Sequence, residues 1–363
     1  MEKNRFIVIM AGGRGERFWP RSRTDLPKQF LPIVGDQPLL VQTLRRLQGV
    51  VPPENLLVLT NREQRPQVLA LCPDLPPENV VGEPVGRDTA PAVALANLLV
   101  QQRRSKATFA MLPADHVIKD VESYQSVLHA AFTAAEENEA LVTIGIQPEH
   151  PATGYGYIRR GEKVTLQSAH SAHKVLQFVE KPDRPTAEQY LKSGEYFWNA
   201  GMFIWRTEVL AAQFQSQAPE ISEGMDRIAE ALAAEQPLDA VLDEHYPSLK
   251  KISVDYAILE NAPEVIVVES AFDWDDVGEW PAVARHFPKD DHGNVTGPNA
   301  IVESGKNNIV FSEKGRLTAV LGVDDLIVVQ TEDATLVCPR SKAQDIKKLV
   351  AKLAKDPNTA HWV

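Results

Sequence analysis

Residues 6–15 read FIVIMAGGRG, an apolar run that ends directly in a glycine-rich turn. Short apolar runs bounded by turn residues are typical of buried parallel strands. Similar runs recur downstream and alternate with helical patterns. We expect strands at residues 55–60, 107–112 and 140–146, and helices at 38–47, 89–104 and 124–137. This alternation predicts an α/β fold in which a mostly parallel sheet carries helices on both faces and binds ligands at the carboxyl ends of its strands.

The pattern changes after about residue 293. Short β-rich runs at residues 308–311, 317–321, 326–329 and 335–338 are separated by turn signals, and an amphipathic helix is expected over Lys342–Leu353. We therefore predict two domains, residues 1–294 with the α/β sheet and residues 295–363 with a small β-rich part and a terminal helix.

Composition limits the function classes. The 363-residue chain has a formal net charge of −11, which disfavours a binding face for nucleic acid or an anionic membrane. Its two cysteines, Cys72 and Cys338, form neither a disulfide framework nor a zinc-site spacing. We find no signal peptide and no apolar segment that could cross a bilayer, and we expect a cytoplasmic protein.

A basic cluster stands out against this acidic background. Residues 12–28 read GGRGERFWPRSRTDLPK and contain five basic residues against two acids. Glycines let backbone N–H groups approach phosphate oxygens closely, and arginine and lysine add cationic donors. The candidate phosphate-binding residues are Gly12, Gly13, Arg14, Gly15, Arg17 and Lys28. The loop predicts a polyphosphate site, although a bare glycine-rich motif is more often a solvated surface turn.

Two better-known phosphate motifs do not fit this loop. A dinucleotide fingerprint needs a third glycine where Phe18 stands, and a P-loop needs Gly-Lys-Ser/Thr, which is absent.

Two acidic segments could hold a metal. Asp115 follows an apolar run and is expected at the carboxyl end of a strand, whereas Asp273, Asp275 and Asp276 lie together in FDWDDVG at residues 272–278. Mg²⁺ commonly takes one or two carboxylates together with substrate phosphates, so one aspartate from each segment would suffice. Asp115 could instead cap a helix, and the second segment could be a solvated acidic turn.

At this point the chain resembles the sugar-1-phosphate nucleotidyltransferases. Residues 12–28 match the signature of that family, and FWPRSR at 18–23 with PKQFL at 27–31 resembles the branch that uses mannose 1-phosphate and GTP. The resemblance implies a Rossmann-like nucleotidyltransferase sheet, a C-terminal left-handed β-helix-like part, homodimer formation, and Mg²⁺ as cofactor with Mn²⁺ as an alternative. It further implies transfer of GMP from GTP to mannose 1-phosphate with release of pyrophosphate.

The resemblance also assigns residues. Asp115 and Asp276 match the metal-binding aspartates; Arg17, Lys28 and Lys181 match the cations that act on the phosphates. The segments that match the family around the sugar contain Gly154, Glu180, Lys181, Asn199 and Gly201. The loop at residues 83–90 matches the base side, where Glu83 and Asp88 are the candidates. A solvated Glu180–Lys181 pair, a β-bulge at either glycine and a helix cap at Asp88 remain alternatives for single residues.

Three other functions are also compatible with the sequence. The chain could be a nucleotidyltransferase for another hexose 1-phosphate or another nucleoside triphosphate, or a non-catalytic nucleotide-sugar binding module. A dehydrogenase is the third alternative, and the missing glycine at Phe18 speaks against it.

Overall fold

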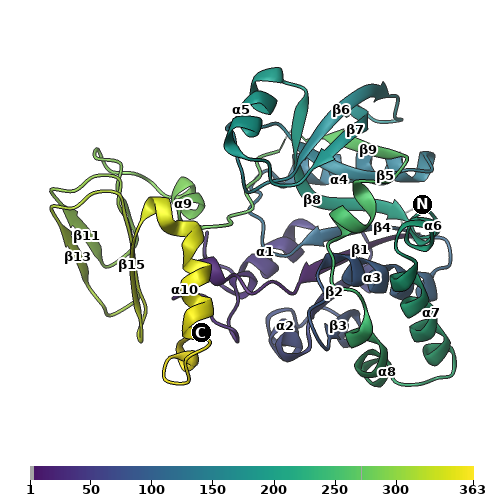
Figure 1. Ribbon diagram of the computed structural model, residues 1–363, viewed down its shortest axis with the longest axis horizontal. Helices are drawn as coiled ribbons and strands as arrows, with labels where there is room; N and C mark the ends of the chain where they lie inside the picture. The colour runs from purple at the N-terminus through teal and green to yellow at the C-terminus, as the bar shows by residue number, and fades with distance from the viewer. Residues whose placement is uncertain (1–3, 271) are drawn as a thin grey trace. The chain divides into compact units, whose positions relative to one another are not determined.

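The computed structural model describes residues 4–270 and 272–363 (Figure 1). The chain divides into two compact units. Unit 1 takes in the chain up to Gly12, together with Leu44–Ala114 and Ile118–Trp274, and unit 2 takes in Gly13–Thr43, Asp115–Val117 and Asp275–Val363. Segments far apart in the sequence thus belong to one unit, and the predicted domain division between residues 294 and 295 remains a prediction.

Unit 1 is built on a nine-stranded sheet in the order β3-β2-β1-β4-β8-β5-β9-β7-β6. The strands are β1 (Arg5–Ala11), β2 (Leu56–Asn61), β3 (Val80–Glu83), β4 (Thr108–Pro113), β5 (Leu141–Ile146), β6 (Tyr157–Val164), β7 (Ala172–Val179), β8 (Tyr196–Arg206) and β9 (Val265–Glu269). The pairings make β7 and β8 run against all the others, so most strands share one direction. The predicted mostly parallel α/β sheet is confirmed.

The apolar opening run forms the central strand β1. Ile7, Val8 and Ile9 are fully buried, and Ile7 lies opposite Leu56 of β2 and Ala110 of β4. A strand that is covered on both faces and flanked by parallel neighbours needs an apolar residue at nearly every position, because neither face is exposed to water. This requirement explains why the opening run does not alternate with polar residues.

Helices cover both faces of this sheet. The helices that lie within unit 1 are α2 (Arg65–Leu71), α3 (Thr89–Arg103), α4 (Val121–Glu137), α5 (Arg184–Ser193), α6 (Thr207–Gln217), α7 (Pro219–Ala233) and α8 (Leu238–His245). Helices α3, α6 and α7 share one apolar cluster with β1, β2 and β4, whereas α4 packs on β4, β5, β8 and β9 outside that cluster. Among the described residues no helix combines the length and apolarity that a membrane crossing requires.

Unit 2 contains the β-rich C-terminal part and a core of its own. Strands β10 (Val295–Thr296), β12 (Ile309–Ser312) and β14 (Leu326–Gln330) form one parallel ladder, extended by the antiparallel β15 (Thr335–Pro339). Strands β11 (Ala300–Glu303) and β13 (Thr318–Leu321) form a second parallel ladder. Because successive strands alternate between the two ladders, this part winds as a β-helix does.

The terminal helix differs in part from its prediction. Residues 342–345 belong to a 3-10 segment, Arg340–Asp345, and only Ile346–Leu353 form the α-helix α10. Helix ends often tighten in this way, and an amphipathic pattern cannot distinguish the two geometries over one turn. A short helix α9 (Trp280–Val283) also belongs to unit 2, and helix α1 (Leu39–Arg46) spans the division between the units.

Candidate active site

The glycine-rich loop of unit 2 is held in one conformation by its own contacts. Gly15 has a φ of 64°, and a Cβ atom there would collide with the Cβ atom of Lys28. The Ser22 hydroxyl donates to the carbonyl of Gly15 at 2.8 Å, and the Gln29 amide donates to the carbonyl of Gly13 at 3.0 Å. Only glycine allows both the left-handed backbone and the close approach to Lys28.

Two cations of this loop, Arg14 and Arg17, take part in none of the ion pairs that the structure describes. Among the described residues, the buried Nε of Arg17 also has no hydrogen-bond partner. A guanidinium outside the described ion pairs can still donate to an anion, and an anion bound at this loop would also satisfy this Nε.

Lys28 joins the two aspartates that the sequence proposed as metal ligands. Its side chain is buried, and its Nζ donates to Oδ2 of Asp115 at 2.9 Å and to the carbonyl of Asp276 at 2.6 Å. Burial opposes ionisation of Asp115, but the charges of Lys28 and His116 outweigh it and lower the pKa of that carboxyl group. Asp115 is therefore an ionised carboxylate, and it caps no helix, because Asp120 is the N-cap of α4.

The structure separates the three acids of the second segment. Asp273 in unit 1 accepts hydrogen bonds from two backbone N–H groups just before α4. Asp275 is buried in unit 2 and bonds to Arg285 at 2.8 Å and His286 at 2.9 Å. Both side chains thus have structural partners, whereas Asp276 lines the same hollow as Lys28 and Asp115.

The backbone beside Asp276 is strained. Val277 is fully buried with a φ of 44°, a conformation that a β-branched residue rarely adopts and that costs about 1–3 kcal/mol. The Gly278 N–H donates to Oδ1 of Asp276 at 3.1 Å, and a Cβ atom at Gly278 would lie 2.8 Å from Oδ2 of that aspartate. Packing around Val277 holds this turn, and with it the Asp276 carboxylate, in place.

These residues surround one hollow of about 460 Å³ within unit 2. Its lining consists of Arg14, Gly15, Glu16, Arg17, Phe18, Lys28, Asp115, His116, Asp276, Gly278 and Lys347. The structure thus brings together three predicted cations and both predicted metal ligands. It adds Lys347 from α10, which sequence reasoning missed, because an exposed lysine on a surface helix carries no signal of its own.

Asn199 lies on β8 of unit 1 and has most of its amide occupied by protein partners. Its Oδ1 accepts from the Gly201 N–H at 3.0 Å and from the Thr143 hydroxyl at 3.3 Å, and its Nδ2 donates to Asp255 at 3.2 Å. Gly201 has a φ of 65° where the register between β5 and β8 shifts. The backbone at Gly201 is therefore a β-bulge, which is one of the alternatives for this glycine. The bulge directs the Asn199 side chain toward Asp255.

Asp255 is a second residue that the sequence did not reveal. It begins a π-helix, Asp255–Leu259, and is half-buried. Burial, with a further contribution from the charge of Glu180, raises its pKa to about 6. π-helical turns are rare and occur often at functional sites, but no residue pattern announces them.

Glu180 and Lys181 follow β7 and form an ion pair with each other. The Glu180 side chain is 13% exposed and that of Lys181 59%, so the lysine can leave this pair at little cost. A Cβ atom at Gly156 would lie 2.7 Å from Oε2 of Glu180, whereas one at Gly154 would meet nothing within 4 Å. Packing against protein atoms therefore explains the glycine at 156 and does not explain Gly154.

The predicted base-side residues lie at the edge of the same sheet. Glu83 ends β3, is buried, and accepts a hydrogen bond from the Tyr246 hydroxyl; burial raises its pKa to about 7. A Cβ atom at Gly12 would lie 3.6 Å from Oε2 of Glu83, so these two predicted residues are neighbours. Asp88 has a φ of 65°, and its carboxylate accepts from the Thr89 N–H as the N-cap of α3.

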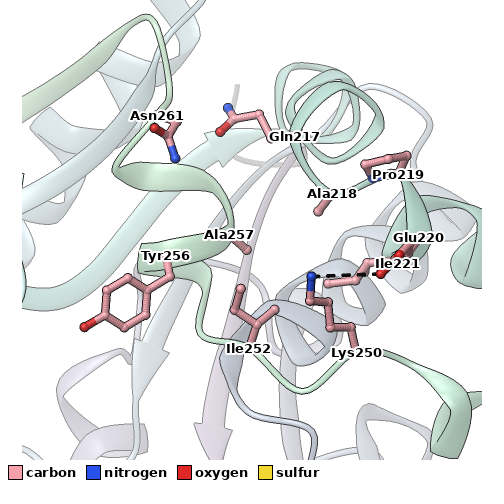
Figure 2. A pocket seen from close by; sticks show the side chains of 10 residues that line it. All are labelled: Gln217, Ala218, Pro219, Glu220, Ile221, Lys250, Ile252, Tyr256, Ala257 and Asn261. Atoms are coloured by element: carbon pink, nitrogen blue, oxygen red, sulfur yellow. Dashed lines mark ion pairs between the residues drawn. The ribbon is translucent and has the colours of Figure 1, made fainter.

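Unit 1 contains a hollow of its own, which Figure 2 shows from close by. Its volume is also about 460 Å³, and it lies where α6 meets α7, beside the π-helix. Lys250 and Glu220 form an ion pair at 4.0 Å at its edge, and apolar side chains such as Ile221 and Ile252 line it. This hollow lacks the group of cations that a polyphosphate requires.

Comparison with known proteins gives matches over nearly the whole chain. The nucleotidyl transferase family model matches residues 7–292, and the model of the MannoseP isomerase/GMP-like beta-helix domain matches residues 299–353. The chain is 39% identical over 356 residues to a mannose-1-phosphate guanylyltransferase of Klebsiella pneumoniae and 40% identical to one of Escherichia coli; each alignment covers 98% of this chain and 75% of the relative.

A solved structure also matches over nearly the whole chain. It is described as a mannose-1-phosphate geranyltransferase from Thermus thermophilus, with 37% sequence identity and a TM-score of 0.82. The match covers 96% of this chain and 99% of the other.

Proposed function

The chain belongs to the nucleotidyl transferase family, and we propose from this membership that it is a mannose-1-phosphate guanylyltransferase. It transfers GMP from GTP to α-D-mannose 1-phosphate and releases pyrophosphate. The observation that carries this proposal is the hollow of unit 2, where arginines outside any described ion pair lie beside Lys28 and two aspartates in a chain of net charge −11. Such a local group of cations in an acidic protein is well suited to a triphosphate.

We assign the phosphates of GTP to the residues of unit 2. Arg14, Arg17 and the backbone N–H groups of the glycine-rich loop bind the β and γ phosphates. Lys28, already fixed between two oxygen atoms, presents its charge without reorganising. Gly12, Glu83 and Asp88 of unit 1 remain candidates for the nucleoside side of GTP.

The sugar phosphate is assigned to residues of unit 1. Lys181 neutralises the phosphate once it leaves Glu180, and Glu180 accepts hydrogen bonds from sugar hydroxyls. Asn199 contributes its remaining N–H and positions Asp255 through the hydrogen bond of 3.2 Å. Gly154 and Gly201 leave room for the backbone to approach the sugar.

A divalent cation, Mg²⁺ with Mn²⁺ as the alternative, fits Asp115 and Asp276. Both are carboxylates on one hollow, and the described residues contain no group of three or more His, Cys, Asp or Glu side chains that could hold a metal alone. Two carboxylates completed by phosphate oxygens are a common set for Mg²⁺. The cation would supply charge neutralisation on the phosphates.

The reaction needs little proton transfer from the protein. A phosphate oxygen of mannose 1-phosphate is already an anion near neutral pH, and it attacks the α-phosphorus of GTP while pyrophosphate leaves. The protein must hold two polyanions in line and stabilise the charge of the transition state. Arg17, Lys28 and Lys181 provide that stabilisation.

The test is pyrophosphate release from mannose 1-phosphate and GTP, with and without Mg²⁺. A matrix of other nucleoside triphosphates and hexose 1-phosphates checks the choice of substrates. We expect the highest kcat/KM for GTP with mannose 1-phosphate and loss of turnover when EDTA removes the metal. Turnover without metal, or a clear preference for another pair, would refute the assignment.

Two finer points are part of this proposal. We infer a homodimer, which light scattering behind size-exclusion chromatography tests. We also infer a cytoplasmic location, consistent with the two cysteines, Cys72 and Cys338, which are both free. Fractionation of cells that express the protein checks it.

A further inference from the structure

The terminal helix α10 is packed against the glycine-rich loop. Ile346 and Val350 of α10 share one apolar cluster with Phe18 and Trp19, and all four side chains are buried. The indole Nε1 of Trp19 donates to the carbonyl of Trp362 at 2.7 Å. Both ends of this C-terminal segment are thereby fixed to the loop that we assign to GTP.

The lysines around the start of α10 differ in their partners. Lys342 and Lys348 both pair with Asp345, at 3.3 and 2.6 Å. Lys347 is exposed, forms no ion pair with any residue that the structure describes, and lines the hollow of unit 2. Of these three neighbouring lysines, Lys347 is the one that reaches the hollow.

The charge at the hollow favours a role for this lysine. The lining contains the cations Arg14, Arg17, Lys28 and Lys347 and the anions Glu16, Asp115 and Asp276. Without Lys347 the side-chain charges of the lining balance before any divalent cation is bound at Asp115 and Asp276, so Lys347 is what gives the lining itself a net positive charge. Since Lys28 is committed to Asp115, an ammonium on a flexible stem outside any described ion pair is well suited to a terminal phosphate.

We propose that Lys347 binds the terminal phosphates of GTP and the pyrophosphate product, which makes α10 part of the nucleotide site. The proposal rests on the proposed function and deepens it, because it assigns a substrate contact to the C-terminal part of the chain. The β-rich part then does more than add a folded appendage, since it holds the helix that supplies this contact.

The test compares Lys347→Ala with Lys348→Ala, a matched control on the next position of the same helix. A charge-assisted contact of an exposed lysine leads us to expect that Lys347→Ala raises KM for GTP, and for pyrophosphate in the reverse reaction, roughly 5- to 20-fold. KM for mannose 1-phosphate stays within about twofold, Lys348→Ala stays near wild type, and Lys347→Arg recovers most of the loss. Lys347 is exposed, so Tm should not change.

A direct binding arm separates this inference from the proposed function. Calorimetry with pyrophosphate and Mg²⁺ should give a weaker Kd for Lys347→Ala than for the wild type and Lys348→Ala. If the wild type lacks guanylyltransferase activity, the proposed function fails, and pyrophosphate binding still decides the role of Lys347. Equal effects of the two alanine variants, or unchanged binding in Lys347→Ala, overturn the inference.

Discussion

The two hollows of this protein have the same volume, about 460 Å³, but very different chemistry. In unit 2 arginines outside any described ion pair lie beside carboxylates on a strained backbone, and a buried lysine ties the aspartates together. In unit 1 the exposed Lys250 and Glu220 form an ion pair beside apolar side chains such as Ile221 (Figure 2). The two hollows differ in charge and in backbone strain, and these properties favour the hollow of unit 2 as the candidate site where the volume does not distinguish them.

The largest effect should follow from removing the lysine at the centre of the charged hollow. We expect Lys28→Ala to lower kcat/KM by roughly two to three decades, the scale seen when one key electrostatic donor is lost. Initial rates of pyrophosphate release measure it, and Tm separates this loss from unfolding, because Lys28 is buried. An unchanged rate would show that Lys28 in the hollow of unit 2 plays no part in turnover.

The next effect concerns stability and pH in unit 1. The pKa of Glu83 is raised from 4.5 to about 7, which corresponds to about 3 kcal/mol. Between these values the folded state binds more protons than the unfolded state, so the free energy of unfolding falls as pH rises from about 4.5 to 7. We expect Glu83→Gln to remove this part of the pH dependence.

Urea unfolding of the wild type and the Glu83→Gln variant at pH 5 and pH 8 measures this difference. The variant should gain stability relative to the wild type at pH 8. Parallel pH dependences in the two proteins would contradict the burial argument.

A smaller effect is expected at Asn199 of unit 1, whose amide is hydrogen-bonded to Asp255. Asn199→Asp places a carboxylate where an amide now donates to Asp255, and the like charges repel. We expect KM for mannose 1-phosphate to rise by about tenfold, with KM for GTP unchanged. The double variant Asn199→Asp, Asp255→Asn should recover most of the loss, and failure to recover would mean that the two side chains act separately.

The smallest effect belongs to the hollow of unit 1. The Lys250–Glu220 pair is exposed and long. Lys250→Ala should therefore leave the free energy of unfolding nearly unchanged and alter each kinetic constant by less than about twofold. Steady-state kinetics with both substrates check this expectation. A large change would mean that the hollow of unit 1 also contributes to substrate binding or turnover.

Two site candidates follow strands that the sequence predicts. Gly12 and Asp115 come after the apolar runs that form β1 and β4, and parallel strands present their carboxyl ends on one side of a sheet. Glu83, which ends β3, came from the resemblance, because no strand was expected there. The choice of Asp276 over its neighbours came from the resemblance. The structure adds a physical reason, since Asp276 lines the hollow that contains Lys28 and Asp115, whereas Asp273 and Asp275 do not line it.

Other features depend on tertiary contacts that no local pattern encodes. Asp255 is brought to Asn199 by a π-helical turn, which arises from packing rather than from residue spacing. Lys347 and Lys348 are indistinguishable in the sequence, and only the docking of α10 on Phe18 and Trp19 separates them. The sequence likewise did not predict that β8 lies antiparallel between β4 and β5, because an apolar run gives no indication of strand direction.

The interleaved make-up of unit 2 has a consequence for how the chain acquires its fold. Residues 13–43 emerge from the ribosome long before Trp280 and Phe311, the partners of Phe18 in its apolar cluster. Contacts between residues so far apart in the sequence form slowly. The backbone amides of the glycine-rich loop should therefore stay unprotected against exchange while the early strands pair. Pulse-labelled hydrogen exchange during refolding should therefore protect the amide of Val8 before that of Phe18, and simultaneous protection would contradict this order.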